Sequence, residues 1–380
     1  MELTQEILDI CILKREGKLN KSWEELAKEY NFTSGEGLRA IVKKRLKREG
    51  QLPTKDDGLN SKKYELQKEK IKVQTEKLEL NKWIREQSRM ELFVEKAFEA
   101  IKNLTPLDVP KPINCFGNEN KSGILIFADS HYGKELIIKG LDGEILNEYN
   151  PEIFEQRMWK ILNKTKSICE KENFDTISLV SLGDSLEGCL RIGALMSIRY
   201  GIVESAIKYV YFLANWINEM SKFVKFKYYN TRGNHTDLRI ITGKKGDFDE
   251  NIEDIMIVLL KEILKNNSNV EIVENKTDKI YFETQGYKIL GIHGEDKNMT
   301  QSLKDYSFIY GKEIDIILSG HRHHANSLNV GFSKGCVGVG SIIGIDDFSM
   351  SLHRISDPSA SFIVVEKGLG KTIEYQINLS

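Results

Sequence analysis

The stretch ILIFADSH at residues 124–131 is a run of apolar side chains that ends in Asp129 and His131. Such a run is typical of a buried β-strand. Because side chains alternate along a strand, residues two positions apart point the same way, so Asp129 and His131 suit one metal ion at the strand's carboxyl end. Short motifs match many sequences by chance, and the prediction therefore depends on the rest of the chain.

The composition indicates a globular protein with more than one folded unit. The chain has 380 residues, 40% of them hydrophobic and 29% charged, and it is too long for one ordinary core. Lys and Arg number 55 against 56 Asp and Glu, so net charge says nothing about partners. There is no run of 18 apolar residues and the first residues include acids, so we expect no membrane segment and a cytoplasmic location. The five cysteines stand singly, which indicates neither a zinc knot nor a disulfide framework.

Residues 1–50 predict a small all-α domain. A first helix is expected from Leu3 to Arg15, and the capping-box patterns Ser22–Glu25 and Thr33–Glu36 precede a second and a third. Two short helices joined by a turn, the second of them basic, resemble a helix-turn-helix. DNA binding and assembly with protein are both open for this domain. The candidate DNA-binding residues are Arg39, Lys43, Lys44, Arg45, Lys47 and Arg48.

A long helix is predicted next. Residues 51–61 contain Pro53 and Gly58 and are expected to form a linker, whereas residues 62–105 contain neither proline nor glycine. Within 80–104, apolar residues recur at steps of three and four, which predicts a coiled coil and a homodimer. Packing of this helix on the neighbouring domain is the alternative. The seam consists of Leu80, Trp83, Met90, Val94, Ala97, Ile101 and Leu104, with Gln87 as its polar member.

Three prolines place a second linker at residues 106–122, before a domain at 123–380. In this domain apolar strands alternate with amphipathic helices, and short strands follow after residue 330. This order predicts the α/β class, with a β-sandwich flanked by helices. Strands are expected at 124–128, 176–182, 224–230, 270–273, 280–283, 287–292, 314–319, 336–339, 361–366 and 372–377, and helices near 151–172, 194–221, 250–266 and 299–310.

Four further hydrophobic runs end in polar residues, as the first one does. Each of these four also has a glycine beside the end of the run. These ends read GDSLEG at 183–188, RGNH at 232–235, HG at 293–294 and SGHRH at 319–323. Ligands of open α/β proteins gather at the carboxyl ends of strands, so five such ends predict one shared site.

The side chains at these ends predict a metal site. Carboxylates, imidazoles and an amide oxygen without a thiolate favour a divalent ion such as manganese, iron or zinc. Seven candidate ligands exceed the needs of one ion and suit two. Two adjacent ions activate a water and neutralise charge on a phosphoryl group, so hydrolysis of a phosphoester is the expected reaction.

The motifs D-x-H, G-D-x-x-E, G-N-H, H-G and G-H-x-H, in this order over 124–324, resemble the calcineurin-like metallophosphoesterase superfamily. The resemblance implies the fold of that superfamily and two divalent ions, Mn²⁺ first, with Fe, Zn or Mg as alternatives. It implies that His235 and Asp184 are catalytic, with His235 stabilising the transition state or protonating the leaving oxygen. It assigns Asp129, His131 and His323 to the first ion, Asn234, His293 and His321 to the second, and Asp184 to both.

Some positions depart from the patterns of known branches. Thr236 stands where an acid usually follows G-N-H, so support for the histidine of that motif comes from Asp237 or from elsewhere. Glu187 stands where SbcD-type nucleases have a catalytic histidine, which weakens the match to that branch. No arginine follows Glu187, which disfavours the protein serine/threonine phosphatases. Arg232 and Arg322 are candidate phosphate-binding residues.

The expected substrate is DNA. An SbcD-like or phage-type nuclease or phosphodiesterase unites the metal site with the basic N-terminal helix, which supplies affinity for phosphates. The alternative is a phosphatase or phosphodiesterase that acts on a small nucleotide and uses the N-terminal region only for assembly. A binding protein with a decayed site is the third alternative, and the complete set of ligand types argues against it.

Overall fold

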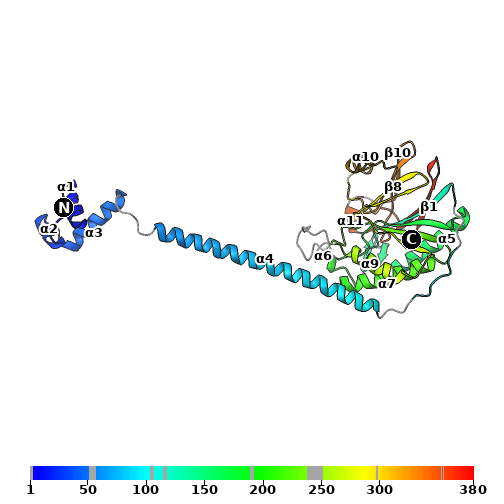
Figure 1. Ribbon diagram of the computed structural model, residues 1–380, viewed down its shortest axis with the longest axis horizontal. Helices are drawn as coiled ribbons and strands as arrows, with labels where there is room; N and C mark the ends of the chain where they lie inside the picture. Colours follow the sequence, from blue (N-terminus) through cyan, green and yellow to red (C-terminus); the bar gives the residue numbers. More distant parts are fainter. Residues whose placement is uncertain are drawn as a thin grey trace. The chain divides into compact units, whose positions relative to one another are not determined.

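The computed structural model describes residues 3–50, 57–102, 107–113, 118–188, 192–237, 251–296, 298–351, 353 and 355–380. The chain divides into two compact units, Met1–Ile84 and Arg85–Ser380. Figure 1 shows a small helical domain, one long helix and a larger α/β body in chain order.

Three helices form the N-terminal domain: α1 (Gln5–Arg15), α2 (Trp23–Glu29) and α3 (Gly35–Arg48). The predicted capping box at the start of α2 is present, since the side chains of Ser22 and Glu25 bond reciprocally to the backbone. The cap predicted at Thr33 is wrong. Ser34 is the extended residue directly before α3, and it accepts the hydrogen bond from the backbone of Gly37.

This domain has its own small apolar core. Leu8, Leu26 and Leu38 are fully buried, with Val42 and Leu46 of α3 packed beside them. Because α3 turns these residues inward, most of its basic side chains lie on the exposed side. The core thus accounts for three short helices holding together as one domain.

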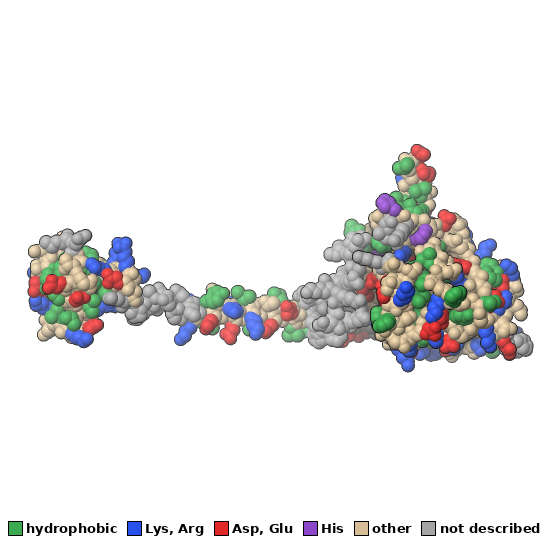
Figure 2. All heavy atoms as spheres, turned by 90° about the horizontal axis from the view of Figure 1, so that it is seen from above, with side chains coloured by type: hydrophobic (Ala, Val, Ile, Leu, Met, Phe, Trp, Pro, Cys, Tyr) green, Lys and Arg blue, Asp and Glu red, His purple; other side chains and the backbone are tan. Residues whose placement is uncertain are grey.

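The long helix α4 spans Asp57–Lys102. The linker predicted at 51–61 is therefore too long. Asp57 is an acid at the start of the helix, where negative charge is favourable, and this offsets the cost of Gly58 in the first turn. The described apolar side chains of α4 are exposed, from 46% for Ile84 to 70% for Leu78, and Figure 2 shows them as green patches between charged side chains. Of the predicted seam, Leu80 is 55% exposed, and the side chains of its other members lie outside the described residues.

Residues 107–113, predicted as part of a linker, pack against the larger unit. Leu107 contacts the main apolar core. The side-chain amide of Asn218 donates to the carbonyl of Asp108, and that of Asn269 donates to the carbonyl of Lys111. Buried amides on the body therefore satisfy the backbone of this extended segment.

The larger unit contains a six-stranded sheet. Its strands in spatial order are β13 (Gly370–Asn378), β12 (Ser359–Glu366), β1 (Lys121–Phe127), β4 (Thr176–Ser181), β5 (Lys225–Asn230) and β6 (Val270–Ile272). β1, β4, β5 and β6 are parallel, and β12 and β13 complete the sheet in antiparallel pairing.

A five-stranded sheet forms the second layer. Its order is β10 (Asn326–Gly331), β11 (Lys334–Gly338), β9 (Ile316–Ser319), β8 (Tyr287–Ile292) and β7 (Ile280–Thr284). β8, β9 and β11 run parallel. A separate hairpin pairs β2 (Leu136–Lys139) with β3 (Ile145–Tyr149).

Helices flank the two sheets. In Figure 1, α5 (Pro151–Glu172), α7 (Ile202–Met220) and α9 (Ile252–Leu264) lie along the six-stranded sheet. α10 (Met299–Tyr310) packs on β9 and β11. Two short helices, α6 (Ile192–Leu195) and α11 (Asp347–Ser351), complete the described helices of this unit.

β1 lies between two apolar layers. Leu125 and Phe127 belong to the core shared with the helices, whereas Ile124 and Ile126 belong to the core between the sheets. All four are fully buried, which explains why this strand is a continuous apolar run. The predicted fold class is confirmed: an α/β sandwich flanked by helices follows a small all-α domain and a long helix.

The structure differs from the predicted elements in a few places. The β2–β3 hairpin and β10 were not predicted, because these strands are short and largely exposed and the apolar stretches of β2 and β3 are only three and two residues long. The single helix predicted at 194–221 is two helices, since α6 ends at Leu195 and α7 begins at Ile202. Between them, Ile198 forms a β-bridge with Lys134, and Gly201 is the residue that precedes α7.

Candidate metal centre

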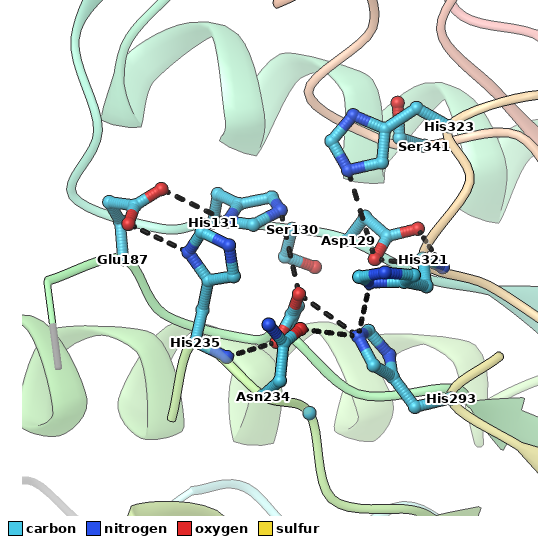
Figure 3. A network of polar contacts seen from close by, with 12 residues as sticks. Asp129, Ser130, His131, Glu187, Asn234, His235, His293, His321, His323 and Ser341 are labelled. Atoms are coloured by element: carbon cyan, nitrogen blue, oxygen red, sulfur yellow. Dashed lines mark hydrogen bonds and ion pairs between the residues drawn. The ribbon is translucent and has the colours of Figure 1, made fainter. Parts of the chain in front are cut away.

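The five predicted strand ends meet at one place. β1, β4 and β5 are parallel neighbours in one sheet, and β8 and β9 are parallel neighbours in the other. Their carboxyl ends therefore open toward the same side. Figure 3 shows the side chains from these loops pointing toward one another. The loops carry Asp129, Asp184, Asn234, His293 and His321.

One group of candidate ligands consists of Asp184, His293 and His321, whose ligand atoms lie within 4.8 Å of one another. Nε2 of His293 is 3.1 Å from Oδ2 of Asp184 and 3.0 Å from Oδ1 of Asn234. It is also 3.1 Å from Nδ1 of His321. Nδ1 of His293 lies 2.8 Å from the carbonyl of Leu182, which fixes the ring so that Nε2 faces the group.

The other group, which the family resemblance assigns to the first ion, consists of Asp129, His131 and His323, again within 4.8 Å and all buried. Nε2 of His323 is 4.0 Å from Oδ1 of Asp129. Nε2 of His131 is 3.9 Å from Oδ2 of Asp184, the same oxygen that faces His293. Asp184 therefore lies between the two groups, and the structure brings all seven predicted metal ligands together.

The backbone at this centre is strained. Left-handed conformations of non-glycine residues cost about 1–3 kcal/mol each and persist only where the surroundings impose them. The glycines of the motifs allow the loops to approach closely: a Cβ on Gly233 would lie 2.0 Å from the backbone nitrogen of Asp184. The candidate ligands in this conformation are Asp129 (φ 54°), His131 (φ 41°), Asp184 (φ 53°), His321 (φ 65°) and His323 (φ 51°).

The residues fit divalent metal ions. His131 is 1% exposed, and its Nε2 has no hydrogen bond among the described residues. A buried ring nitrogen without a hydrogen bond is costly, and coordination would satisfy it. The donors are carboxylate, imidazole and amide groups with no thiolate, which suits manganese, iron or zinc in octahedral or similar sites.

Burial and mutual contact shift the pKa values of these groups. Burial raises the pKa of the Asp129 carboxyl. Burial opposes protonation of His293, but the adjacent Asp184 outweighs it and raises the pKa of His293 to about 10. Burial and the neighbouring His293 lower the pKa of His321 to about 3. Without a metal ion, a proton on His293 supplies the positive charge beside Asp184. Metal binding must displace this proton, so the affinity of the centre for metal ions should rise with pH.

Glu187 supports His235. Oε1 of Glu187 is 2.8 Å from Nδ1 of His235, and Oε2 is 3.2 Å from Nδ1 of His131 (Figure 3). Burial would raise the pKa of Glu187, but these two histidines hold it well below its usual value. The support for this histidine was left open between Asp237 and a residue elsewhere, and the contact with Glu187 identifies the residue elsewhere, while the carboxylate of Asp237 accepts a hydrogen bond from Asn251. Spacing in the sequence gave no sign of this contact, because it joins two separate loops.

Two further acids were not predicted. Asp346 Oδ1 lies 3.3 Å from Nδ1 of His323, and Asp346 follows β11 in a segment without any recognisable motif. Glu253, at the start of α9, accepts hydrogen bonds from the backbone of Ser185 at 2.8 Å and of Gly233 at 3.1 Å. Glu253 thereby links the loop that carries Asp184 to the loop that carries Asn234.

The two candidate phosphate-binding arginines lie beside the centre with protein partners. Arg232 forms an ion pair with Asp254 at 2.9 Å, and Arg322 donates to the carbonyl of Asp296. Arg232 also lines a cavity of about 130 Å³ that adjoins Asn234 and His293. Arg232 therefore lines the same cavity as two of the candidate metal ligands.

The six basic residues of α3 fall into two kinds. Arg45 is half-buried, donates to the carbonyl of Leu3 and the side chain of Gln5, and pairs with Glu49, so it ties α3 to the chain before α1. The other five are exposed and available to a ligand: Arg39, Lys43, Lys44, Lys47 and Arg48.

None of the described helices is long and apolar enough to cross a membrane.

Several solved structures are similar to this chain. They include a dimetal phosphatase from Danio rerio (9% identity, TM-score 0.35, covering 68% of this chain and 99% of that one). A metallophosphoesterase from Sphaerobacter thermophilus matches with 11% identity, TM-score 0.30 and coverage of 68% and 88%. Vps29 complexed with zinc from Entamoeba histolytica matches with 12% identity, TM-score 0.29 and coverage of 67% and 99%.

The sequence comparison is closer. Residues 62–104 match the YonJ coiled-coil domain, which agrees with the helix and seam predicted there. YonJ, a protein derived from the SPbeta prophage of Bacillus subtilis strain 168, is 32% identical over 382 residues, covering 95% of this chain and 93% of YonJ. Identity at this level across both chains places the protein in the YonJ family.

Proposed function

We propose that this protein is a two-metal phosphoester hydrolase of the calcineurin-like superfamily. The observation that carries the proposal is the position of Asp184 between two buried groups of ligands. Two divalent ions held there, Mn²⁺ first among them, would supply an activated water and neutralise charge on the phosphoryl group. The first ion would be bound by Asp129, His131 and His323. The second would be bound by Asn234, His293 and His321, and Asp184 would serve both ions.

His235 is the proton donor to the leaving oxygen in this proposal. Its ring lies edge-on to His131 with centroids 4.6 Å apart, and its side chain is 18% exposed, so it borders the centre and solvent. Glu187 on Nδ1 leaves Nε2 directed away from the acid. Burial lowers its pKa, but Asp184 and Glu187 outweigh burial and raise the pKa of His235 above its usual value. A protonated imidazole at that place can donate to the leaving group.

DNA is the proposed substrate. Five exposed basic side chains on α3 are available for sequence-independent contact with phosphates, and the helix-turn-helix order of α2 and α3 suits that use. A cytoplasmic nuclease or phosphodiesterase unites this domain with the metal centre. Glu187 in place of a histidine makes its proton-transfer group differ from that of the SbcD-like branch.

A small nucleotide is the second candidate. The cavity beside Asn234 and His293 has a volume of about 130 Å³, and its lining includes the acids Asp278 and Glu295 and the bases Arg232 and Lys279. A small cavity lined by polar groups of both signs suits a small polar ligand. In this case the N-terminal domain would serve assembly alone.

A homodimer through residues 80–104 is also proposed. It is supported by the match of 62–104 to a coiled-coil domain and by the exposed apolar side chains of α4. Light scattering at several concentrations tests it, and a strict monomer would contradict it.

The substrate is tested by incubating the purified protein and Mn²⁺ with labelled single-stranded DNA, duplex DNA, RNA and nucleotides, beside the model diester bis-p-nitrophenyl phosphate. Cleavage of DNA supports the nuclease. Hydrolysis of the model diester with every DNA substrate intact would refute the nuclease and favour the small nucleotide.

A further inference from the structure

We propose that Lys134 is a positioning residue. It contacts two buried acids, Glu187 and Asp346, and through them orients His235 and the histidines of the first metal group. The inference rests on the proposed two-metal centre. Lys134 lies in the loop after β1, three residues beyond His131, and no motif points to it.

The ammonium of Lys134 contacts both supporting acids. Nζ lies 3.5 Å from Oε2 of Glu187 and 3.4 Å from Oδ2 of Asp346. The side chains of these three residues are 15%, 2% and 3% exposed, so the ion pairs are shielded from solvent. Among ion pairs that join described residues, Lys134 is the only lysine or arginine partner of either acid.

Each acid faces the Nδ1 atom of a histidine at the centre. Glu187 faces His131 at 3.2 Å and His235 at 2.8 Å, and Asp346 faces His323 at 3.3 Å. His131 and His323 both belong to the first metal group. His293 of the second group has a backbone carbonyl on its Nδ1 instead, so the second group is independent of these acids.

The need for a lysine follows from the charge on the acids. A histidine that binds a metal through Nε2 is neutral and offers only an Nδ1 hydrogen to its supporting acid. The acid then keeps its full negative charge, and a buried carboxylate without a cation is costly. One ammonium between two such carboxylates supplies the opposite charge and fixes the direction of both. Its loss should let the acids turn toward water and release the imidazoles they orient.

The backbone sets the position of Lys134. Its amide donates to the carbonyl of His131 at 3.1 Å, and the residue forms a β-bridge with Ile198. On either side, the backbone amide of Arg199 donates to the carbonyl of Gly133, and the backbone amide of Glu135 donates to the carbonyl of Ser197, both at 2.8 Å. The lysine therefore points at the acids from a fixed loop.

The test is Mn²⁺ binding by the full chain carrying Lys134→Met. The control is Lys334→Met, because Lys334 also lies between two acids, Glu313 at 2.8 Å and Asp315 at 3.4 Å, but on β11. We expect Lys134→Met to weaken one of two Mn²⁺ sites about tenfold, as loss of a supporting partner does. The other site should keep its affinity, which shows that the variant is folded. Lys134→Arg should restore the first site, and Lys334→Met should bind both ions normally.

Electron paramagnetic resonance supplies a second readout, since a coupled Mn²⁺ pair should give way to isolated Mn²⁺ in Lys134→Met at limiting metal. Two unchanged affinities in Lys134→Met, equal loss in Lys334→Met, or no rescue by Lys134→Arg would overturn the role of Lys134. If Lys134→Met does not fold, Lys134→Gln is measured by the same criteria. Failure of the unaltered protein to bind Mn²⁺ would overturn the proposed function itself, which is a distinct result.

Discussion

Oε1 of Glu187 lies 2.8 Å from Nδ1 of His235, although 48 residues separate them in the chain. This contact holds the imidazole with Nε2 directed away from the acid, as proton donation by His235 in the proposed reaction requires. In this protein the acid that supports G-N-H comes from the G-D-x-x-E motif.

The role of His235 predicts a dependence on the leaving group. His235→Ala should slow hydrolysis of an alkyl phosphodiester about 10²- to 10⁴-fold, because a poor leaving group needs a proton. Hydrolysis of bis-p-nitrophenyl phosphate should fall much less, since p-nitrophenolate leaves without one. Rates for both substrates at saturating Mn²⁺ check this. Equal losses on the two substrates would contradict proton donation.

The place of Asp184 between the two groups predicts loss of function on substitution. Asp184→Asn should reduce kcat for the model diester by at least about 10²-fold, because the side chain serves both groups and stabilises charge at the reacting centre. The exposed Asp305 on α10 provides a matched control, as Asp305→Asn makes the same chemical change away from the centre. Full activity of Asp184→Asn would refute its shared role.

The exposed lysines of α3 predict salt-dependent DNA binding. Replacing Lys43, Lys44 and Lys47 with Ala should weaken DNA binding and reduce the slope of log affinity against log salt by about one for each lysine that contacts a phosphate. Turnover of the model diester should stay unchanged. Fluorescence anisotropy over a salt series measures the slope. Arg45 is left intact because it ties α3 to Leu3.

A matched control removes the same charge elsewhere. Lys62, Lys63 and Lys68 on α4 are exposed, and their replacement with Ala should leave the salt slope as it is. An unaltered affinity in the α3 variant would restrict the N-terminal domain to assembly.

Burial of Glu253 predicts a pH-dependent stability difference. Burial raises its pKa to about 7, against an ordinary value of 4.5. The unfolded chain then loses this proton at lower pH than the folded chain does, so the contribution of Glu253 to stability falls as pH rises from 4.5 to 7. Relative to Glu253→Gln, the chelator-treated protein should lose about 3 kcal/mol of unfolding free energy across this window. Urea titrations at several pH values measure the difference, and a difference independent of pH would show that Glu253 is ionised throughout.

The strand ends were predictable because their signal is local. An apolar run, a glycine and a polar residue lie together in the sequence at Asp184, Asn234 and His321, and parallel strands must open to one side. Gly233 shows why a glycine is required there, since a Cβ at this position would collide with the backbone of Asp184.

The supporting acids were not predictable for the opposite reason. Glu187 and Asp346 act through contacts between distant loops, and nothing beside Asp346 in the sequence marks it. The inward turn of Arg45 likewise depends on packing of α3 against the chain before α1. Such roles follow from tertiary structure, which one sequence does not display.

The most direct test of the central claim is a Mn²⁺ titration of the chelator-treated protein, with bound metal and hydrolysis of bis-p-nitrophenyl phosphate followed together. The two ligand groups joined by Asp184 predict two ions per chain, with full activity only when both are bound. Binding of one ion or none, or hydrolysis that is independent of added metal, would contradict a two-metal phosphoesterase.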